Sequence, residues 1–229
     1  GVVRRAGGGA TEPRDGFGEN WKNHREKILS AWKETITAGD TVIMAGDISW
    51  ATHLEDALSD LKTLSALPGR KIIVRGNHDY WWNTVSKMKR MTDNAFEFIF
   101  NSALSVENIA LAGTRGWIPE TSKKITEEDK VIILREQGRL ERSLIEAEKF
   151  NCEKIFAILH YPPFDEQRRP TKMMEIMKSH GVTDCIYGHI HGKQNFNNLP
   201  KELEGIQLHL TSSDYLNFKP LLLTEWNES

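Results

Sequence analysis

Four short apolar segments limit the possible folds of this chain, because polar residues that can bind a metal ion follow each of them. The segments are residues 41–45, 71–74, 154–159 and 184–187, and each reads as a short buried strand. Open α/β sheets bind their ligands at the carboxyl ends of such strands. The sequence therefore predicts an α/β protein with a polar site where these strands end.

The residues after the four strands carry several side chains that bind metals in proteins. Gly46-Asp47 follows the first strand, and Gly76-Asn77-His78-Asp79 follows the second. His160 follows the third strand, and Gly188-His189-Ile190-His191 follows the fourth. Together these residues offer a mixed set of oxygen and nitrogen ligands, which suits divalent ions such as Mn, Fe, Zn or Co.

The order of these motifs resembles that of the calcineurin-like metallophosphoesterases, over residues 40–192 approximately. The resemblance implies an α/β fold with two sheets in a β-sandwich flanked by helices, in α/β/β/α layers. It also implies a metal-dependent phosphohydrolase. Such an enzyme cleaves phosphoester bonds with a metal-bound hydroxide as nucleophile and forms no covalent enzyme intermediate.

The resemblance assigns metal binding to five residues: Asp47, Asn77, His160, His189 and His191. Asp47 matches the position that bridges two ions, and His191 would serve the first ion while the other three residues complete the second site. His78 would act as the catalytic residue that protonates the leaving oxygen. Asp79 would orient the His78 imidazole.

One motif of the family does not occur in this sequence. The family has a first strand that ends in Asp-x-His, and no Asp-x-His is found in residues 1–229. One alternative is that the start is missing or altered, and that two divalent ions (Mn, Fe or Zn) bind per chain. The other is a protein that lost half of its first site, binds one ion, and is a weak or inactive metal- or phosphate-binding protein. Of the nearby ligand types, Asp15 is expected in a turn and His24 on a helix surface.

Composition limits the partners and the compartment. The formal net charge of −2 argues against a broad basic face for nucleic acid, so nuclease activity is less favoured than hydrolysis of a phosphorylated small molecule or other phosphoester. No apolar run reaches the length of a membrane span, and no secretory signal is visible. Cys152 and Cys185 are expected to be thiols in a reducing cytoplasm. The composition leaves the oligomeric state open.

Strands and helices alternate along the chain, which favours one domain. We expect residues 1–18 to be irregular and flexible, and residues 19–229 to form a single metallophosphoesterase domain. Residues 96–100 and 109–113 are predicted strands of a second sheet. Loops 114–129 and 161–170 suit a substrate-facing role. Arg115 in the first loop fits either a phosphate contact or a structural role; Arg168 and Arg169 in the second fit either an anionic substrate or a solvated turn.

Overall fold

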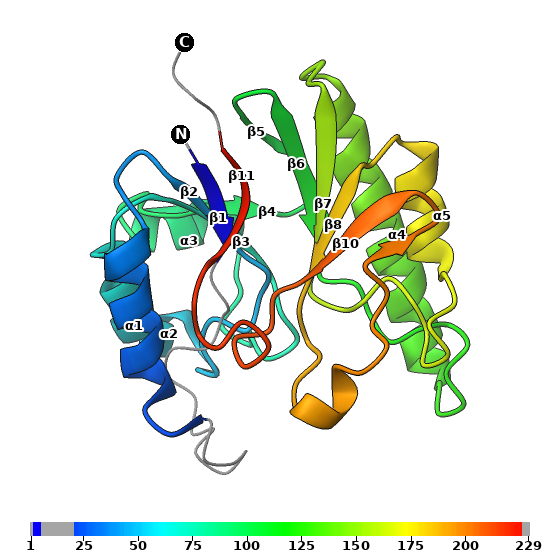
Figure 1. Cartoon of the computed structure of the whole chain (residues 1–229), viewed down its shortest axis with the longest axis horizontal. Helices are drawn as coiled ribbons and strands as arrows, with labels where there is room; N and C mark the ends of the chain where they lie inside the picture. Colours follow the sequence, from blue (N-terminus) through cyan, green and yellow to red (C-terminus); the bar gives the residue numbers. More distant parts are fainter. Residues whose placement is uncertain (1, 6–20, 226–229) are drawn as a thin grey trace. The chain divides into compact units, whose positions relative to one another are not determined.

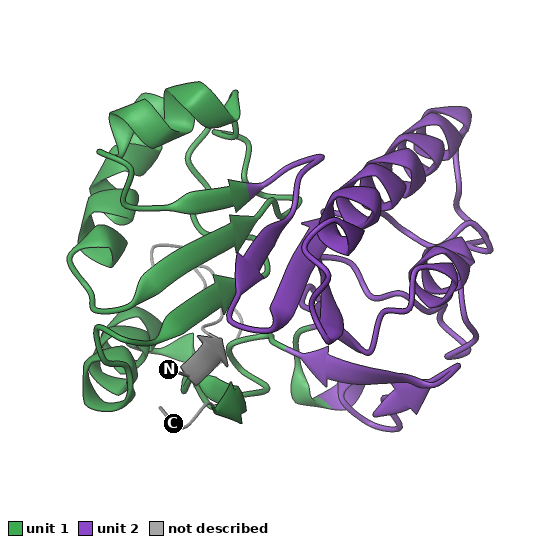
Figure 2. Ribbon diagram, turned by 90° about the horizontal axis from the view of Figure 1, so that it is seen from above, with its two compact units in different colours: residues 1–98, 191–193, 211–229 green, residues 99–190, 194–210 purple. Residues whose placement is uncertain are grey.

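The computed structural model describes residues 2–5, as backbone only, and residues 21–225. It is a mixed α/β structure with two sheets, each flanked by helices (Figure 1). The described chain divides into two compact units, coloured in Figure 2. Unit 1 comprises residues 1–98, 191–193 and 211–229, and unit 2 comprises residues 99–190 and 194–210. The single domain expected from the sequence stays a prediction.

The sheet of unit 1 has the strand order β11-β1-β2-β3-β4. Its strands are β1 (Val2–Arg5), β2 (Thr41–Met44), β3 (Arg70–Val74), β4 (Glu97–Ile99) and β11 (Leu221–Glu225). β1, β2 and β3 run parallel, whereas β11 pairs antiparallel with β1. The loops that follow β2 and β3 therefore leave the sheet at the same edge, which brings two of the sequence motifs together.

Three helices pack on the unit 1 sheet through one apolar cluster. They are α1 (His24–Thr35), α2 (Leu54–Ser65) and α3 (Val85–Met91). Leu54, Ala57, Leu61 and Leu64 recur on one side of α2 and are buried, as the helical period predicts. Lys71 at the start of β3 donates from its ammonium group to the carbonyls of Leu67 and Gly69, and so fixes the turn between α2 and β3.

The sheet of unit 2 has the strand order β5-β6-β7-β8-β10-β9. Its strands are β5 (Leu104–Val106), β6 (Ile109–Thr114), β7 (Lys154–Leu159), β8 (Asp184–Tyr187), β9 (Glu202–Leu203) and β10 (Ile206–Leu210). The four central strands, β6, β7, β8 and β10, are parallel, and both edge strands pair antiparallel. The loops after the central strands thus share one edge of this sheet.

Helices α4 (Glu127–Glu148) and α5 (Lys172–Ser179) pack with this sheet around the second apolar cluster, and the 3-10 helix η3 (Lys193–Asn195) lies farther along the chain. A capping box starts α4: the Thr126 hydroxyl accepts from the Asp129 N–H, and the Asp129 carboxylate accepts from the Thr126 N–H. Leu140 and Leu144 of α4 are fully buried, and Met173, Met174 and Met177 of α5 join them in the core.

Two expectations from the sequence need correction. Strand β1 lies within residues 1–18, where an irregular chain was expected; residues 6–18 lie outside the described residues. Strand β4 belongs to the unit 1 sheet rather than to the second sheet, because it is the edge neighbour of β3.

Candidate functional site

The loop after β2 holds Asp47 in a strained conformation close to the loop after β3. Asp47 has a φ of 55°, in the left-handed region that few residues other than glycine adopt. Its carboxylate Oδ1 accepts a hydrogen bond of 2.9 Å from the His78 N–H. A Cβ on Gly76 would lie 2.1 Å from the same oxygen, so a glycine is required there. The half-buried side chains of Asn77 and His78 follow in this loop.

Asp79 anchors these two loops from beneath. Its carboxylate is fully buried and accepts hydrogen bonds from the N–H groups of Gly76 (2.7 Å), Asp47 (2.8 Å) and Ile48 (2.7 Å), and from the Trp81 indole (3.0 Å). Burial, followed by the nearby Asp47 carboxylate, raises the pKa of Asp79 to about 6, whereas the amide donors lower it. Asp79 therefore fixes the backbone that carries Asp47.

The structure corrects the expectation that Asp79 orients the His78 imidazole. The hydrogen bonds of the Asp79 carboxylate described above go to backbone and indole N–H groups rather than to the His78 imidazole. Instead, the Trp50 ring stacks on the imidazole with centroids 4.2 Å apart and an angle of 24° between planes. The Tyr80 hydroxyl lies 3.4 Å from His78 Nδ1, and Tyr80 is 55% exposed. Two aromatic side chains orient the proposed catalytic histidine.

His191 is held by a residue that the sequence analysis missed. Asp214 Oδ1 lies 2.9 Å from His191 Nδ1, and Asp214 Oδ2 accepts a 2.8 Å hydrogen bond from the Gly192 N–H. Burial alone would raise the pKa of Asp214, but these hydrogen bonds lower it below its ordinary value. With Nδ1 bonded to a carboxylate, Nε2 of the His191 ring is the nitrogen left for a metal. A signal existed in the sequence, because Asp214 follows the residues of β10 within a short polar run.

His160 and His189 meet in unit 2, at the ends of the neighbouring parallel strands β7 and β8. His160 Nε2 lies 3.2 Å from His189 Nδ1. The Gly188 N–H donates to the His160 carbonyl (3.0 Å), and this bond links the two loops. His189, like Asp47, has a positive φ, here 68°. Two of the proposed metal ligands thus occupy a conformation that usually marks a functional constraint.

The pair fits a shared cation. Two imidazole nitrogens that each bind one ion at about 2.0–2.1 Å lie roughly 3.0–3.4 Å apart, depending on the coordination geometry. The separation of 3.2 Å between His160 and His189 falls within this range. Over residues 21–225, the structure contains no group of three or more His, Cys, Asp or Glu side chains placed to hold a metal ion. The observed arrangement is a pair in unit 2, with oxygen and nitrogen donors in unit 1.

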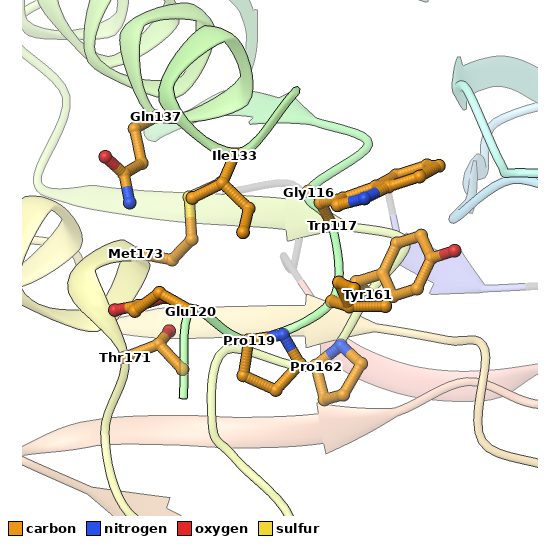
Figure 3. Close-up of a pocket in the computed structure, with 11 residues that line it drawn as sticks. Gly116, Trp117, Pro119, Glu120, Ile133, Gln137, Tyr161, Pro162, Thr171 and Met173 are labelled. Atoms are coloured by element: carbon orange, nitrogen blue, oxygen red, sulfur yellow. The ribbon is translucent and has the colours of Figure 1, made fainter. Parts of the chain in front are cut away.

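The loops after β6 and β7 form an aromatic wall beside this pair. The Tyr161 ring contacts His189 with centroids 4.0 Å apart, and the Trp117 ring lies 5.4 Å from Tyr161. The Trp117 indole donates to Asp129 (2.9 Å), which ties the loop to the start of α4. Trp117 and Tyr161 also line the pocket in Figure 3, which is narrow and has room for about one water molecule. This pocket is too small for a substrate.

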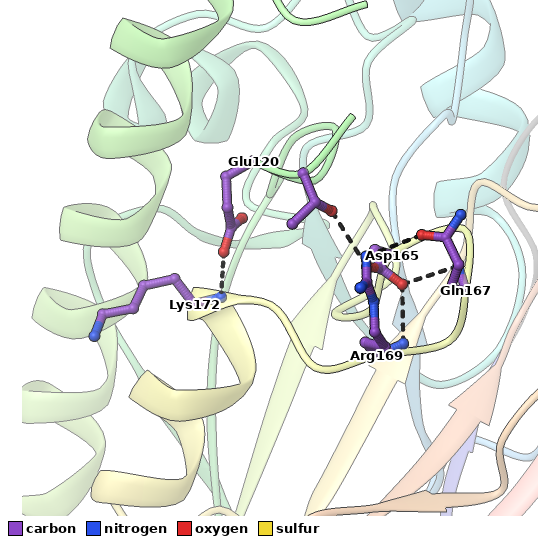
Figure 4. A network of polar contacts seen from close by, with 6 residues as sticks. Glu120, Asp165, Gln167, Arg169 and Lys172 are labelled. Atoms are coloured by element: carbon purple, nitrogen blue, oxygen red, sulfur yellow. Dashed lines mark hydrogen bonds and ion pairs between the residues drawn. The ribbon is translucent and has the colours of Figure 1, made fainter. Parts of the chain in front are cut away.

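The second loop, residues 161–170, is closed by its own ion pair. Asp165 is buried, and its carboxylate accepts hydrogen bonds from the Arg169 guanidinium (2.8 Å) and from the N–H groups of Gln167 and Arg169 (Figure 4). Glu120 accepts from the Lys172 N–H at the start of α5 (2.6 Å), and the Thr121 hydroxyl donates to Asp165 (3.3 Å), which connects the two loops. Of the two alternatives for Arg169, an anionic substrate or a solvated turn, the structure favours the turn, because Arg169 is exposed and pairs with Asp165 of the same loop.

His24 and Asp15 are the two other residues near the start of the chain whose side chains could bind a metal. His24, expected on the surface, is buried at 5% exposure; its Nδ1 lies 3.0 Å from the Trp21 carbonyl. The helix face that carries His24 turns inward because Trp21 packs edge-on against both His24 and His191. Asp15 lies outside the described residues.

The motifs, their order and their placement at strand ends agree with one protein family. A family model described as "Calcineurin-like phosphoesterase" matches residues 18–193, which is more than half of the chain. The chain belongs to the calcineurin-like phosphoesterases. Members of this family generally bind divalent metals and act on phosphoester substrates. Family membership confirms the resemblance seen in the sequence and makes this a phosphoesterase at the level of the family.

Solved structures support the calcineurin-like fold. TT1561 from Thermus thermophilus aligns with a TM-score of 0.60 and 13% identity, covering 97% of this chain and 98% of that one. AQ665 from Aquifex aeolicus aligns with a TM-score of 0.52 and 16% identity, covering 96% and 95%. Phosphopantetheinyl hydrolase from Mycobacterium tuberculosis aligns with a TM-score of 0.53 and 13% identity, covering 92% and 88%. At these identities the likeness shows the fold alone.

Two further findings are negative. A search of curated proteins gives no match to this phosphoesterase. Among the described helices, none is both long enough and apolar enough to cross a bilayer.

Proposed function

We propose that this protein is a metal-dependent phosphohydrolase whose metal ligands are Asp47, Asn77, His160, His189 and His191. The observation that carries the proposal is the 3.2 Å approach of His160 Nε2 to His189 Nδ1 at the ends of two parallel strands. Two nitrogens so close together repel unless a proton or a cation lies between them, and family membership favours the cation. Manganese, iron and zinc all suit this mixed donor set.

The metal ions would neutralise the charge of the phosphate and lower the pKa of a water molecule near it. The chain's own residues would do the rest. Asp79 holds the loop of Asp47 through backbone hydrogen bonds, and Asp214 holds His191 through its ring nitrogen. Fixed ligands of this kind keep a metal site in one geometry before the substrate arrives.

His78 is the proposed general acid. As the bond from phosphorus to the leaving oxygen breaks, the imidazolium would give its proton to that oxygen. The oxygen of a water molecule that has released one proton to the solvent would form the new bond to phosphorus. Trp50 stacks on the ring and Tyr80 lies at Nδ1, so the imidazole has little freedom to rotate. An imidazole suits this role because its pKa lies near neutral pH.

The test is hydrolysis of an aryl phosphate monoester and of the matching diester with added Mn²⁺. We expect turnover in the wild type that falls at least about a hundredfold in His78→Ala, as for loss of a general acid. Asp47→Asn and His189→Ala should abolish metal-dependent turnover. His180→Ala is the control, because His180 caps the end of α5, pairs with Glu148 and is not a proposed ligand.

Three outcomes are informative. Equal activity in all four variants would show that these residues do not form the site. Faster cleavage of the diester would favour a phosphodiesterase, which is the remaining route to nuclease activity. Metal binding with no turnover in the wild type would support the alternative function, a metal- or phosphate-binding protein.

The two free thiols, Cys152 and Cys185, support a reducing compartment, and the cytoplasm stays our prediction.

A further inference from the structure

Arg115 lies in unit 2, directly after β6, and its donors are poorly satisfied. Its side chain is 14% exposed, and its nearest acceptor is Glu136, at 3.5 Å from Nη2. The Nε–H group is buried and has no hydrogen-bond partner within the described chain. A guanidinium carries five N–H donors, and one long contact leaves most of them available. Burial of the cation lowers the pKa of Arg115, and Glu136 opposes this only in part.

The charges around Arg115 do not cancel. Glu136 on α4 is completely buried and accepts close hydrogen bonds from Arg139 (2.5 Å) and from the Thr114 hydroxyl (2.6 Å). Two guanidinium groups therefore share one carboxylate, and the nearer of the two is Arg139. The cluster carries one net positive charge in a largely buried place. Such a charge is costly unless an anion completes it.

The backbone of Arg115 also contacts one proposed metal ligand, His160. Its carbonyl accepts hydrogen bonds from the N–H groups of His160 (3.0 Å) and Tyr161 (2.9 Å). The Trp117 indole lies over the guanidinium, 4.3 Å from ring centroid to Cζ, and the Trp117 ring then contacts Tyr161. A guanidinium held over an indole has less freedom to rotate, and its planar N–H fork suits bidentate binding of an oxyanion.

Other arginines of the neighbouring loop are less suited to this role. Arg169 donates to the buried Asp165 carboxylate, so its charge is already paired (Figure 4). The Arg168 guanidinium lies against the Phe164 ring at 5.4 Å. Of these three arginines, Arg115 combines burial, a shared counter-charge and a backbone bond to a proposed metal ligand.

We propose that Arg115 is the residue of unit 2 that binds an oxyanion, and that the anion is the phosphoryl group of the substrate. The identity of the anion rests on the proposed phosphohydrolase function, whereas the oxyanion site itself does not. Arg115 would receive two non-bridging oxygens through its N–H fork, and Trp117 and Glu136 would position the fork. The ligand class is a phosphate monoester, or the inorganic phosphate that its hydrolysis releases.

The experiment measures binding of inorganic phosphate by calorimetry, with and without Mn²⁺, to the wild type, Arg115→Gln and Arg115→Lys. The control is Arg142→Gln, which removes the same charge from the exposed side of α4. We expect Arg115→Gln to weaken phosphate binding by about tenfold or more, as for loss of a charge-assisted hydrogen bond. Arg115→Lys should lose a smaller factor because lysine keeps the charge but lacks the fork. The control should bind as the wild type does.

Thermal melts show which variants fold. If Arg115→Gln does not fold, Arg115→Lys takes its place in the comparison, because lysine keeps the positive charge beside Glu136. Wild-type phosphate affinity in either folded variant overturns the proposal, and so does a wild type that binds no phosphate. In aryl phosphate assays, Arg115→Gln should raise KM more than it lowers kcat. A wild type without turnover whose phosphate binding still depends on Arg115 would support the oxyanion site and reject the hydrolase.

Discussion

At position 76 the protein depends on the absence of a side chain. A Cβ on Gly76 would meet the Asp47 carboxylate at 2.1 Å and the Asp47 N–H nitrogen at 2.2 Å. A Cβ on Gly46, whose φ is 88°, would lie 2.5 Å from the Cα of Gly76. The two glycines let the loops after β2 and β3 approach so closely that Asp79 can bond both. Small residues, rather than the ligands alone, therefore make the unit 1 part of the site possible.

Gly76→Ala should displace the Asp47 carboxylate. We expect a loss of about 1–3 kcal/mol in the free energy of unfolding, from overpacking, and at least about tenfold weaker Mn²⁺ binding. Gly39→Ala is the control, because its added Cβ would meet its nearest atom at 4.0 Å. Calorimetric titration and urea denaturation measure the two effects. Equal Mn²⁺ affinity in both variants would contradict the role assigned to this contact.

Asp214→Asn should weaken metal binding without unfolding the protein. The asparagine keeps the shape but loses the charge that holds His191 Nδ1, and loss of such outer support costs about 10–100-fold in metal affinity. Asp184→Asn provides a matched control, because Asp184 pairs with His209 (2.8 Å) between β8 and β10. Mn²⁺ titration should separate the two variants. A result with Asp184→Asn as the weaker binder would refute the role of Asp214.

At the scale of the element, strand ends and helix starts position the site. Each proposed ligand lies within four residues of the end of a parallel strand, so the register of the sheet sets its place. In unit 2, β6 and β7 pair so that Thr114 lies opposite Leu159, and the following residues, Arg115 and His160, then meet through a backbone hydrogen bond. Helix α4 supports this edge through Glu136 and through Ser143, whose hydroxyl accepts from the Gly113 N–H.

The capping box of α4 gives a stability prediction. Thr126→Ala removes the hydroxyl that accepts from the Asp129 N–H, and we expect a loss of about 1 kcal/mol in the free energy of unfolding. Thr126→Ser keeps the hydroxyl and should restore most of that loss. Urea denaturation of the three proteins at one pH makes the comparison. A serine variant as unstable as the alanine variant would count against the cap.

The link between β8 and β10 predicts a pH dependence. Burial alone would raise the pKa of Asp184, but the hydrogen bonds of His209 and Thr183 lower it below the ordinary value of 3.8. The folded state then binds fewer protons than the unfolded state, so this carboxylate stabilises the fold above that value. The stabilisation is lost as the pH falls through the lowered pKa. Unfolding of Asp184→Asn and wild type should differ at pH 7 and converge in strong acid; a constant difference would contradict the assignment.

At the scale of the whole molecule, the proposed ligands are divided between the two compact units. Asp47, Asn77 and His191 belong to unit 1, and His160 and His189 belong to unit 2. The chain passes from unit 2 to unit 1 between Ile190 and His191, within a single motif. A cation bound by the His160–His189 pair would stabilise the folded chain, because the unfolded chain does not hold the two imidazoles together.

Metal removal tests this coupling. With Mn²⁺ at about a hundred times its dissociation constant, the free energy of unfolding should rise by about 2.7 kcal/mol, and a chelator should reverse the change. His189→Ala should abolish most of this shift, and His180→Ala should keep it. Thermal melts with Mn²⁺ and with EDTA provide the measurement. An unchanged melting temperature in the wild type would show that no metal binds the folded state.

The sequence alone determined the family, the alternation of strands and helices, and the side chains at four strand ends. These features depend on local patterns: an apolar run makes a strand, and the residues after it lie at the sheet edge. Tertiary structure decided what local patterns do not encode. It placed β4 in the first sheet, buried His24, turned the Asp79 carboxylate toward the Asp47 loop, and brought Asp214 to His191. Each of these depends on contacts between residues far apart in the chain, which no spacing in the sequence records.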